Sequence, residues 1–180
     1  METMDQFKLV KNERILIDTN ILVYCGDNDF GLQAKKLLRI LKDNKNNLAV
    51  SHASCFELIK NAIDDKLREY YFSLLDYMDN LPITQEIVAS SAFLYHTYLK
   101  SGMQSAKKIE SFDLIISGTV TFHKGALLLT ANRQDFPMPF WINVAQGYIM
   151  YKVGENYQLI NIFLLKFDYS LISKKDKVEM

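Results

Sequence analysis

Three short apolar runs alternate with stretches of helical periodicity, and this alternation restricts the fold more than any other feature of the chain. The runs cover residues 14–18, 48–50 and 126–129, which is the length of a buried parallel strand. Residues 30–41 place apolar side chains every three or four positions, with Lys35, Lys36 and Arg39 between them, as an amphipathic helix does. The alternation predicts an α/β domain around a central parallel sheet.

Further elements follow from local signals. Ser51 and Thr84 are residue types that cap helices, and they precede predicted helices at 52–63 and 84–101. Helices are also predicted at 64–78 and from 111 to about 124, with a short extended segment at 81–83. Residues 140–167 are rich in Tyr, Phe, Ile and Val and predict two or three extended segments at the sheet edge. We expect a single domain over 1–180, with a core at about 14–137 and an extension at 138–180 packed on it.

Composition excludes several classes of protein. The chain has 180 residues, 49% hydrophobic and 23% charged, which suits one folded domain and not a disordered chain. Lys plus Arg and Asp plus Glu are 21 each, so no overall charge points to nucleic acid. No apolar run reaches about 18 residues, and the start is too polar for a signal peptide. Cys25 and Cys55 fit small buried side chains in a reducing compartment, so we expect the cytoplasm and no membrane.

The stretch ILIDTNILVY, residues 15–24, interrupts an apolar run with Asp18, Thr19 and Asn20. A buried charge costs several kcal/mol unless it is paired or coordinates an ion. The polar residues therefore require either a local structural partner, such as a helix beginning at Ile21 that Asp18 would cap, or a cation.

Other acids fall near the same predicted edge of the sheet, where parallel α/β folds bind ligands. Asp135 lies in the loop 130–135 after the third strand, Glu57 follows the second strand, and Asp113 is in the first turn of a helix. Each has a structural explanation: Glu57 as a solvated helix residue, Asp113 as a partner of the helix dipole, and Asp135 as a turn acid. The combination is what favours a shared site.

The segments around these acids resemble the four acidic motifs of the PIN domain. The matching segments are Asp-Thr-Asn at 18–20, Ser-Cys-Phe-Glu-Leu at 54–58, Phe-Asp-Leu-Ile-Ile-Ser-Gly-Thr at 112–119 and Leu-Thr-Ala-Asn-Arg-Gln-Asp-Phe at 129–136. They are most similar to small prokaryotic PIN proteins, VapC-type toxins among them, over about residues 14–137. The resemblance implies a PIN-like three-layer α/β/α sandwich with a central parallel sheet, here followed by a β-rich C-terminal extension.

The resemblance also implies a metal-binding catalytic pocket formed by Asp18, Glu57, Asp113 and Asp135, and supporting polar positions at Thr19, Asn20, Thr130 and Asn132. Carboxylates drawn together repel unless a cation neutralises them, and hard oxygen ligands favour Mg²⁺ or Mn²⁺. In this interpretation Asp18 is the principal ligand and Glu57 orients or deprotonates the attacking water. Thr130 would bond a phosphate or a metal-bound water. His52, His96 and His123 lie outside the motifs, so no zinc set is present.

The expected activity is a metal-dependent endoribonuclease, and more specifically the toxin of a toxin–antitoxin pair. Its expected partners are an RNA substrate, a cognate antitoxin and a second copy in a homodimer. Candidate phosphate contacts are Lys60, Lys107, Lys108 and Arg133, although a solvated surface also explains such residues. One alternative is a non-catalytic PIN-fold binding module in an RNA-related assembly. A small-ester phosphatase is a weaker alternative, because it would need Asp-x-Asp where this chain has Asp-Thr-Asn.

Overall fold

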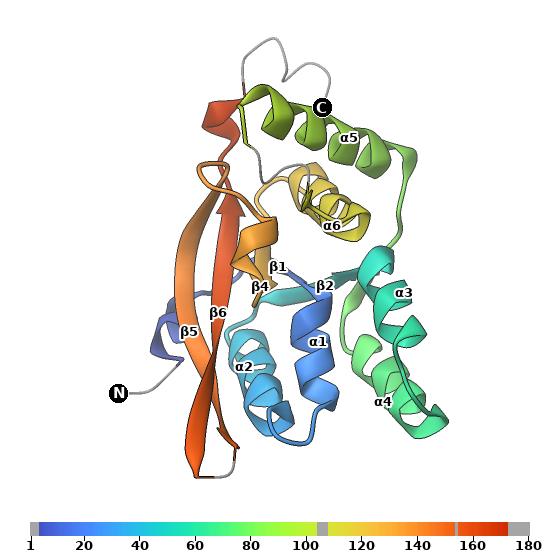
Figure 1. Cartoon of the computed structure of the whole chain (residues 1–180), viewed down its shortest axis with the longest axis vertical. Coiled ribbons are helices and arrows are strands. Elements are labelled where there is room, and N and C mark those ends of the chain that lie inside the picture. Colours follow the sequence, from blue (N-terminus) through green and yellow to red (C-terminus); the bar gives the residue numbers. More distant parts are fainter. Residues whose placement is uncertain (1–3, 104–107, 154, 173–180) are drawn as a thin grey trace.

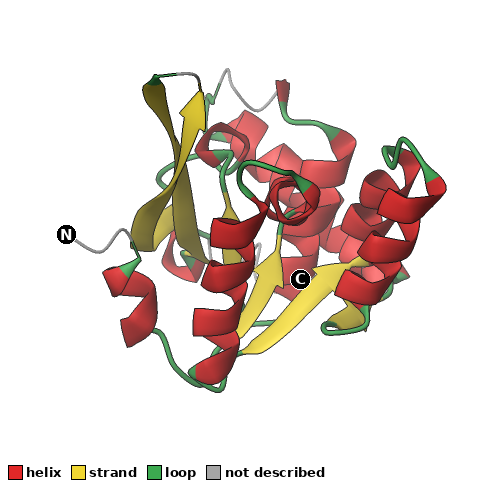
Figure 2. Ribbon diagram, turned by 90° about the horizontal axis from the view of Figure 1, so that it is seen from below, coloured by secondary structure: helices red, strands yellow, loops and turns green. Residues whose placement is uncertain are grey.

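A six-stranded mixed sheet runs through the molecule and carries helices on both faces (Figures 1 and 2). The structure is a computed structural model and describes residues 4–103, 108–153 and 155–172. The strand order is β3-β2-β1-β4-β6-β5. The strands are β1 (Arg14–Ile17), β2 (Asn47–Ser51), β3 (Asp79–Leu81), β4 (Leu127–Thr130), β5 (Trp141–Val153) and β6 (Asn156–Phe167). β1, β2, β3 and β4 pair in parallel, whereas β6 runs antiparallel to its two neighbours, β4 and β5. The three predicted core strands are confirmed as β1, β2 and β4.

Six α-helices connect or follow these strands. They are α1 (Thr19–Gly26), α2 (Gly31–Asp43), α3 (His52–Lys60), α4 (Asp65–Leu75), α5 (Gln85–Lys100) and α6 (Ser111–Phe122). Ser51 and Thr84 cap α3 and α5 through their side-chain oxygens, as predicted. Two predicted helix ends were wrong. The helix expected at 52–63 ends at Lys60, because Asp64 must leave the helix to cap α4 at Leu67. The helix expected at 64–78 ends at Leu75, which leaves a turn before β3; β3 itself lies two residues before the predicted 81–83.

Alternation along the central strands divides the interior into two cores, one on each face of the sheet. Ile15 and Ile17 of β1 point into the core covered by α1, α2 and α4, whereas Leu16 points into the core covered by α5 and α6. The neighbouring strands follow the same rule, with Val50 on the first side and Ala49 on the second. The predicted three-layer α/β/α sandwich is confirmed, and Figure 2 shows the helices on either side of the strands.

The N-terminal segment contributes to the first core, which the sequence analysis did not foresee. A short 3-10 helix, η1 (Asp5–Leu9), brings Phe7 into the interior together with Met4 and Val10. Gln6 beside it accepts a hydrogen bond from the backbone N–H of Gln146 on β5 at 2.9 Å. The side-chain oxygen of Gln33 on α2 likewise accepts a hydrogen bond from the backbone N–H of Met150 on β5 at 3.0 Å. These side chains satisfy part of the outer edge of β5, which otherwise offers unpaired backbone groups.

The C-terminal extension forms a long hairpin that continues the sheet. β6 pairs with β4, with Leu165 opposite Leu128, and β5 pairs with β6 along its length. The base of the hairpin places Trp141 and Phe167 in the second core. The predicted β structure at the sheet edge is confirmed, while the assignment of the whole chain to one domain stays a prediction. None of the helices in the described part of the chain has the length and apolar character needed to cross a bilayer.

Gly118 marks the closest approach of α6 to α5. A Cβ atom at this position would lie 2.8 Å from the carbonyl oxygen of Ile87 and 2.9 Å from the backbone nitrogen of Ser91. We expect Gly118→Ala to lower the free energy of unfolding by about 1–3 kcal/mol, because backbone must move to admit the methyl group. Urea denaturation checks this, with Ser111→Ala at the exposed start of α6 as the control. Equal stability of the two variants would contradict the close packing.

Candidate active site

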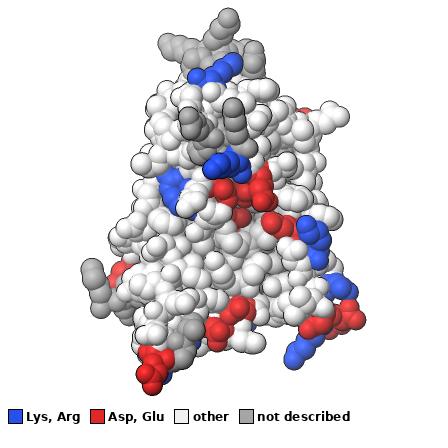
Figure 3. All heavy atoms as spheres, viewed as in Figure 1, with Lys and Arg blue, Asp and Glu red and all other residues white. Residues whose placement is uncertain are grey.

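The four predicted acids come together in one cavity of about 340 Å³ at the carboxyl ends of the parallel strands. Asp18 directly follows β1, Glu57 lies on α3, Asp113 lies on α6, and Asp135 ends the short 3-10 helix η3 (Arg133–Asp135) after β4. In Figure 3 acidic atoms gather on this face over the space between α1, α3 and α6. Acids up to 117 positions apart in sequence (135 minus 18) therefore share one pocket.

Asp18 is held by side chains and does not act as a conventional helix cap. It occupies the N-cap position of α1, but its carboxylate makes no capping hydrogen bond there. Its Oδ2 instead accepts hydrogen bonds from Thr130 Oγ1 at 2.6 Å and Asn20 Nδ2 at 2.5 Å. The carboxylate is 3% exposed. The capping explanation for the polar interruption is therefore wrong in this structure, and the carboxylate is fixed at the cavity wall.

The supporting polar residues tie the ends of β1 and β4 together. Asn20 Oδ1 accepts from the backbone N–H of Ala131 at 2.9 Å, and Thr130 Oγ1 accepts from that of Asn132 at 2.9 Å. The Asn132 side chain donates to the Asp135 carboxylate. Thr130 is completely buried, is not among the cavity-lining residues, and holds Asp18 through its hydroxyl; its expected contact with a phosphate or a metal-bound water stays a prediction.

The electrostatics of the cavity disfavour several ionised carboxylates at once. Burial raises the pKa of Asp18 to about 6, against the opposing effect of its hydrogen bonds, and the charge of Glu57 adds to the rise. Burial raises the pKa of Asp113 to about 8, reinforced by the charges of Asp18, Asp135 and the other acids of the cavity. The pKa of Asp135 is also raised, first by burial. No described residue that lines the cavity is Lys, Arg or His, so the acids lack a protein cation inside it.

These residues fit a hydrated divalent cation by their chemistry. Thr19 lines the cavity, and its buried hydroxyl has no hydrogen-bond partner among the described residues, which leaves it free to bond a water. Within the same part of the chain, no three His, Cys, Asp or Glu side chains are spaced to ligate one ion directly. Mg²⁺ usually keeps several waters and takes one or two protein carboxylates, so a group of three direct ligands is not required for it.

A fifth acid, Glu110, also lines the cavity and was missed by the sequence analysis. It occupies the N-cap position of α6, and its charge raises the pKa of both Asp113 and Asp135. The available signal was its spacing, since residues three apart at the start of a helix share a face. Glu110 adds another oxygen donor to the pocket.

The candidate phosphate contacts that the structure describes lie outside the cavity lining. Lys60 and Lys108 are exposed, and Lys107 falls outside the described residues. Arg133 donates to the carbonyl oxygens of Phe136 and Trp141, the latter at 2.5 Å, and so holds the loop before β5. The roles of these residues as phosphate contacts stay predictions. For Arg133, the hydrogen bonds to the loop before β5 give an alternative, structural role.

Two aromatic pairs include a cavity-lining residue or sequence neighbours of the acids. Phe56, next to Glu57, is 58% exposed and lies 5.9 Å from the ring of Phe112, next to Asp113. In the second pair, Tyr24 lines the cavity and its ring lies 5.3 Å from that of Phe30. The sequence analysis did not anticipate these pairs, because residues 56 and 112 approach each other only through the packing of α3 on α6.

We expect the stability of the metal-free protein to fall as pH rises from 5 to 8. An unfolded Asp has a pKa near 3.9. In the folded protein the pKa of Asp18 is about 6 and the pKa of Asp113 is about 8. Between about pH 3.9 and these pKa values, the folded state retains protons that the unfolded state has lost. Stability from these groups is therefore present at low pH and is lost as pH rises. Asp113→Asn should flatten this dependence and stabilise the metal-free protein at pH 8 by on the order of 1–2 kcal/mol.

Urea denaturation in EDTA at pH 5, 6.5 and 8 measures the effect. Glu69→Gln, an exposed change on α4, is the matched control and should keep the wild-type slope. A wild type equally stable at pH 5 and 8, or an Asp113→Asn variant with an unchanged slope, would show that the acids do not repel as described.

Comparison with known proteins bears on the fold. No protein-family model matches the sequence, and no curated protein matches it. Among solved structures, a chain of a toxin–antitoxin complex from Klebsiella pneumoniae is 24% identical, with a TM-score of 0.52 over 69% of this chain and 92% of that one. A chain of VapBC2 from Rickettsia felis, bound to a DNA fragment from its promoter, is 23% identical, with a TM-score of 0.54 over 68% and 90%. A chain of DNA-bound VapBC from Salmonella typhimurium is 16% identical, with a TM-score of 0.55 over 71% of this chain and 93% of that one.

The chain has a PIN-like fold. Both the expected resemblance and the expected fold class are thereby confirmed at the level of architecture. The matched chains are covered almost completely, whereas about three tenths of this chain lies outside each match. This PIN-like chain is therefore longer than the matched chains. At these identities the comparison speaks for the fold, and the chemistry must be argued from the cavity itself.

Proposed function

We propose that the chain is a metal-dependent endoribonuclease that hydrolyses RNA phosphodiester bonds in the acidic cavity. The observation that carries this proposal is the convergence of Asp18, Glu57, Asp113 and Asp135, joined by Glu110, in a cavity to which no described residue contributes a cationic side chain. Such a set of oxygen donors is unfavourable by itself, as the raised pKa values of Asp18 and Asp113 show, and becomes favourable when a divalent cation is present.

Asp18 would be the principal ligand of Mg²⁺ or Mn²⁺, and Asp113 and Asp135 would complete the site directly or through the waters of the ion. When bound, the ion supplies positive charge that lowers the pKa of a water molecule and offsets the charge of the phosphate. Asp18 needs no rearrangement for this task, because Thr130 and Asn20 already fix one of its oxygens. Glu57 would orient the attacking water and accept its proton.

The surroundings of the cavity support a single-stranded nucleic acid as substrate. The exposed Phe56 ring pairs with Phe112, and these residues adjoin Glu57 and Asp113 in sequence. Exposed aromatic rings bind unpaired bases by stacking without requiring a particular sequence. RNA remains the proposed substrate on the strength of the PIN resemblance.

We further propose that the protein is the toxin of a toxin–antitoxin pair. The support is the fold, since the solved structures that it resembles are toxin–antitoxin complexes. The expected partner is a small cognate antitoxin that covers the cavity; a homodimer and a cytoplasmic location belong to the same proposal. Co-purification with the product of a small adjacent reading frame would support it, and the absence of such a frame would count against the toxin assignment alone.

The test of the nuclease proposal is cleavage of a mixed pool of single-stranded and structured RNA by the purified protein. We expect cleavage with Mg²⁺ or Mn²⁺, loss of cleavage with EDTA, and recovery when metal is added back. A parallel assay for phosphate release from a small phosphate monoester should be negative. A folded, metal-supplied protein that leaves the RNA intact would favour the binding-module alternative, and release from the monoester would favour a phosphatase.

A further inference from the structure

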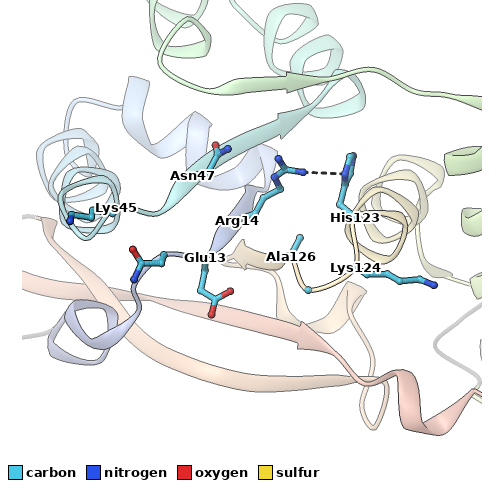
Figure 4. Close-up of a pocket in the computed structure, with 9 residues that line it drawn as sticks. Glu13, Arg14, Lys45, Asn47, His123, Lys124 and Ala126 are labelled. Atoms are coloured by element: carbon cyan, nitrogen blue, oxygen red, sulfur yellow. Dashed lines mark hydrogen bonds between the residues drawn. The ribbon is translucent and has the colours of Figure 1, made fainter.

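A second hollow, of about 640 Å³, lies at the opposite end of the parallel strands from the acids (Figure 4). The starts of β1 and β2 supply Arg14 and Asn47, and the turn that leads into β4 supplies His123, Lys124 and Ala126. Arg14 and Asp18 stand at the two ends of β1, roughly 13 Å apart for four residues of extended chain. No residue lines both hollows, so the two are separate.

The hollow is rich in positive charge without partners. Arg14, Lys45 and Lys124 line it, and none of them forms an ion pair with a residue that the structure describes. Glu13 is the one acid among the described lining residues, and Figure 4 shows its carboxylate directed away from the Arg14 guanidinium. The Asn47 side chain donates a hydrogen bond to the carboxylate of Asp79, which does not line the hollow, at 2.8 Å. The lining therefore attracts anions.

His123 holds Arg14 in place. An Arg14 Nη1 atom lies 3.3 Å from His123 Nδ1, and the contact is drawn as a dashed line in Figure 4. Arginine can only donate, so Nδ1 is the acceptor and the neutral ring carries its proton on Nε2. The other N–H groups of the Arg14 guanidinium remain available for a ligand. A planar guanidinium with a fixed orientation is suited to bind two oxygens of one phosphate.

The backbone around the hollow is held in an uncommon conformation. Asn12, Lys45 and Gly125 line it with φ angles of 58°, 61° and 90°. Of the positive-φ residues among those described, only Gly102 lies elsewhere. Glycine adopts this conformation easily, whereas a lysine does so at a cost of roughly 1 kcal/mol. Lys45 directly follows the C-cap residue of α2, a position where a positive φ commonly ends a helix, so the end of α2 sets where this side chain begins.

We propose that this hollow binds a phosphate-bearing anion through Arg14, Lys45 and Lys124. Its volume lies within the range of small-ligand sites, and it is open enough to accept one or two phosphate groups. Three cationic residues from three separate segments line it, and in Figure 4 the Lys124 side chain extends away from Arg14. The proposal is independent of the chemistry in the acidic cavity.

Calorimetric titration with inorganic pyrophosphate, in EDTA so that no metal can recruit the anion to the acids, tests the site. We expect binding that weakens with added salt. Lys45→Gly and Lys124→Gln should each reduce the affinity by about tenfold, the size of one charge-assisted hydrogen bond. Lys45→Gly should at the same time melt at a higher temperature than the wild type, because glycine relieves the positive φ.

Lys36→Gln, an exposed change on α2 outside both hollows, is the matched control, and Asp18→Asn should also bind pyrophosphate normally. A short single-stranded oligonucleotide titrated in parallel identifies the source of the phosphate. If the wild type binds the oligonucleotide more tightly than pyrophosphate, and Lys45→Gly abolishes that binding, the natural ligand is a nucleic-acid backbone. If it binds the oligonucleotide more weakly than pyrophosphate, the natural ligand is a small phosphate compound. Lack of pyrophosphate binding at millimolar concentration, or equal affinity in Lys45→Gly, Lys124→Gln and Lys36→Gln, would overturn the proposal.

Discussion

Asp18→Asn is expected to abolish RNA cleavage, with a loss in kcat/KM of at least about 10²-fold, while the protein stays folded. An amide keeps the shape of the carboxylate and its hydrogen bond to Thr130, but it binds a divalent cation poorly. The substitution also removes one member of a set of mutually repelling acids, so the metal-free variant should be at least as stable as the wild type at pH 8.

Cleavage rates at saturating Mg²⁺ and melting curves, measured on the same preparations, separate the two effects. Glu69→Gln is again the control, because it removes an acid from the exposed side of α4 and should retain wild-type activity. Cleavage by Asp18→Asn at the wild-type rate would place the activity elsewhere or identify it as a contaminant.

Trp141→Ala is expected to lower the free energy of unfolding by about 3–5 kcal/mol, a large part of the stability of an ordinary domain. Trp141 is fully buried at the base of the hairpin, between the rings of Phe136 at 5.4 Å and Phe167 at 5.3 Å. Its indole N–H donates to the Tyr98 hydroxyl on α5 at 2.8 Å. Truncation leaves a cavity and an unsatisfied hydroxyl, and it weakens the attachment of β5 to the second core.

The matched control is Tyr157→Ala, which removes an aromatic ring from the other strand of the same hairpin where it is 63% exposed. This change should shift stability by less than about 0.5 kcal/mol. Similar, small effects of the two substitutions in urea denaturation would mean that the C-terminal extension is not part of the folded core.

The central architecture could be predicted because short-range patterns determine it. The apolar runs at 14–18, 48–50 and 126–129 form β1, β2 and β4. A strand buried on both faces is apolar along its length, so it can be recognised in the sequence without knowing which strand it pairs with. The acids were predictable because parallel strands carry their loops to one edge, so Asp18 and Asp135 had to approach each other once β1 and β4 paired.

Other features depend on contacts that no local pattern encodes. The pairing of β6 with β4 joins segments separated by the whole of β5. The cover that Gln6 and Gln33 give to β5 is set by packing between segments more than a hundred residues apart. Glu110 was missed because a helix N-cap acid has an ordinary structural explanation. The basic hollow was missed because Arg14, Lys45 and Lys124 are unremarkable singly and meet only after the strands have aligned.

An anomalous difference map from crystals grown with Mn²⁺ tests the central claim most directly, because it locates the cation without reference to any substrate. We predict a Mn²⁺ peak in the acidic cavity, in contact with Asp18 and with at least one water, and its loss in Asp18→Asn crystals grown in the same way. Wild-type crystals at millimolar Mn²⁺ with no peak in this cavity, or with the ion bound only at another site, would contradict the assignment of the acids as a metal centre.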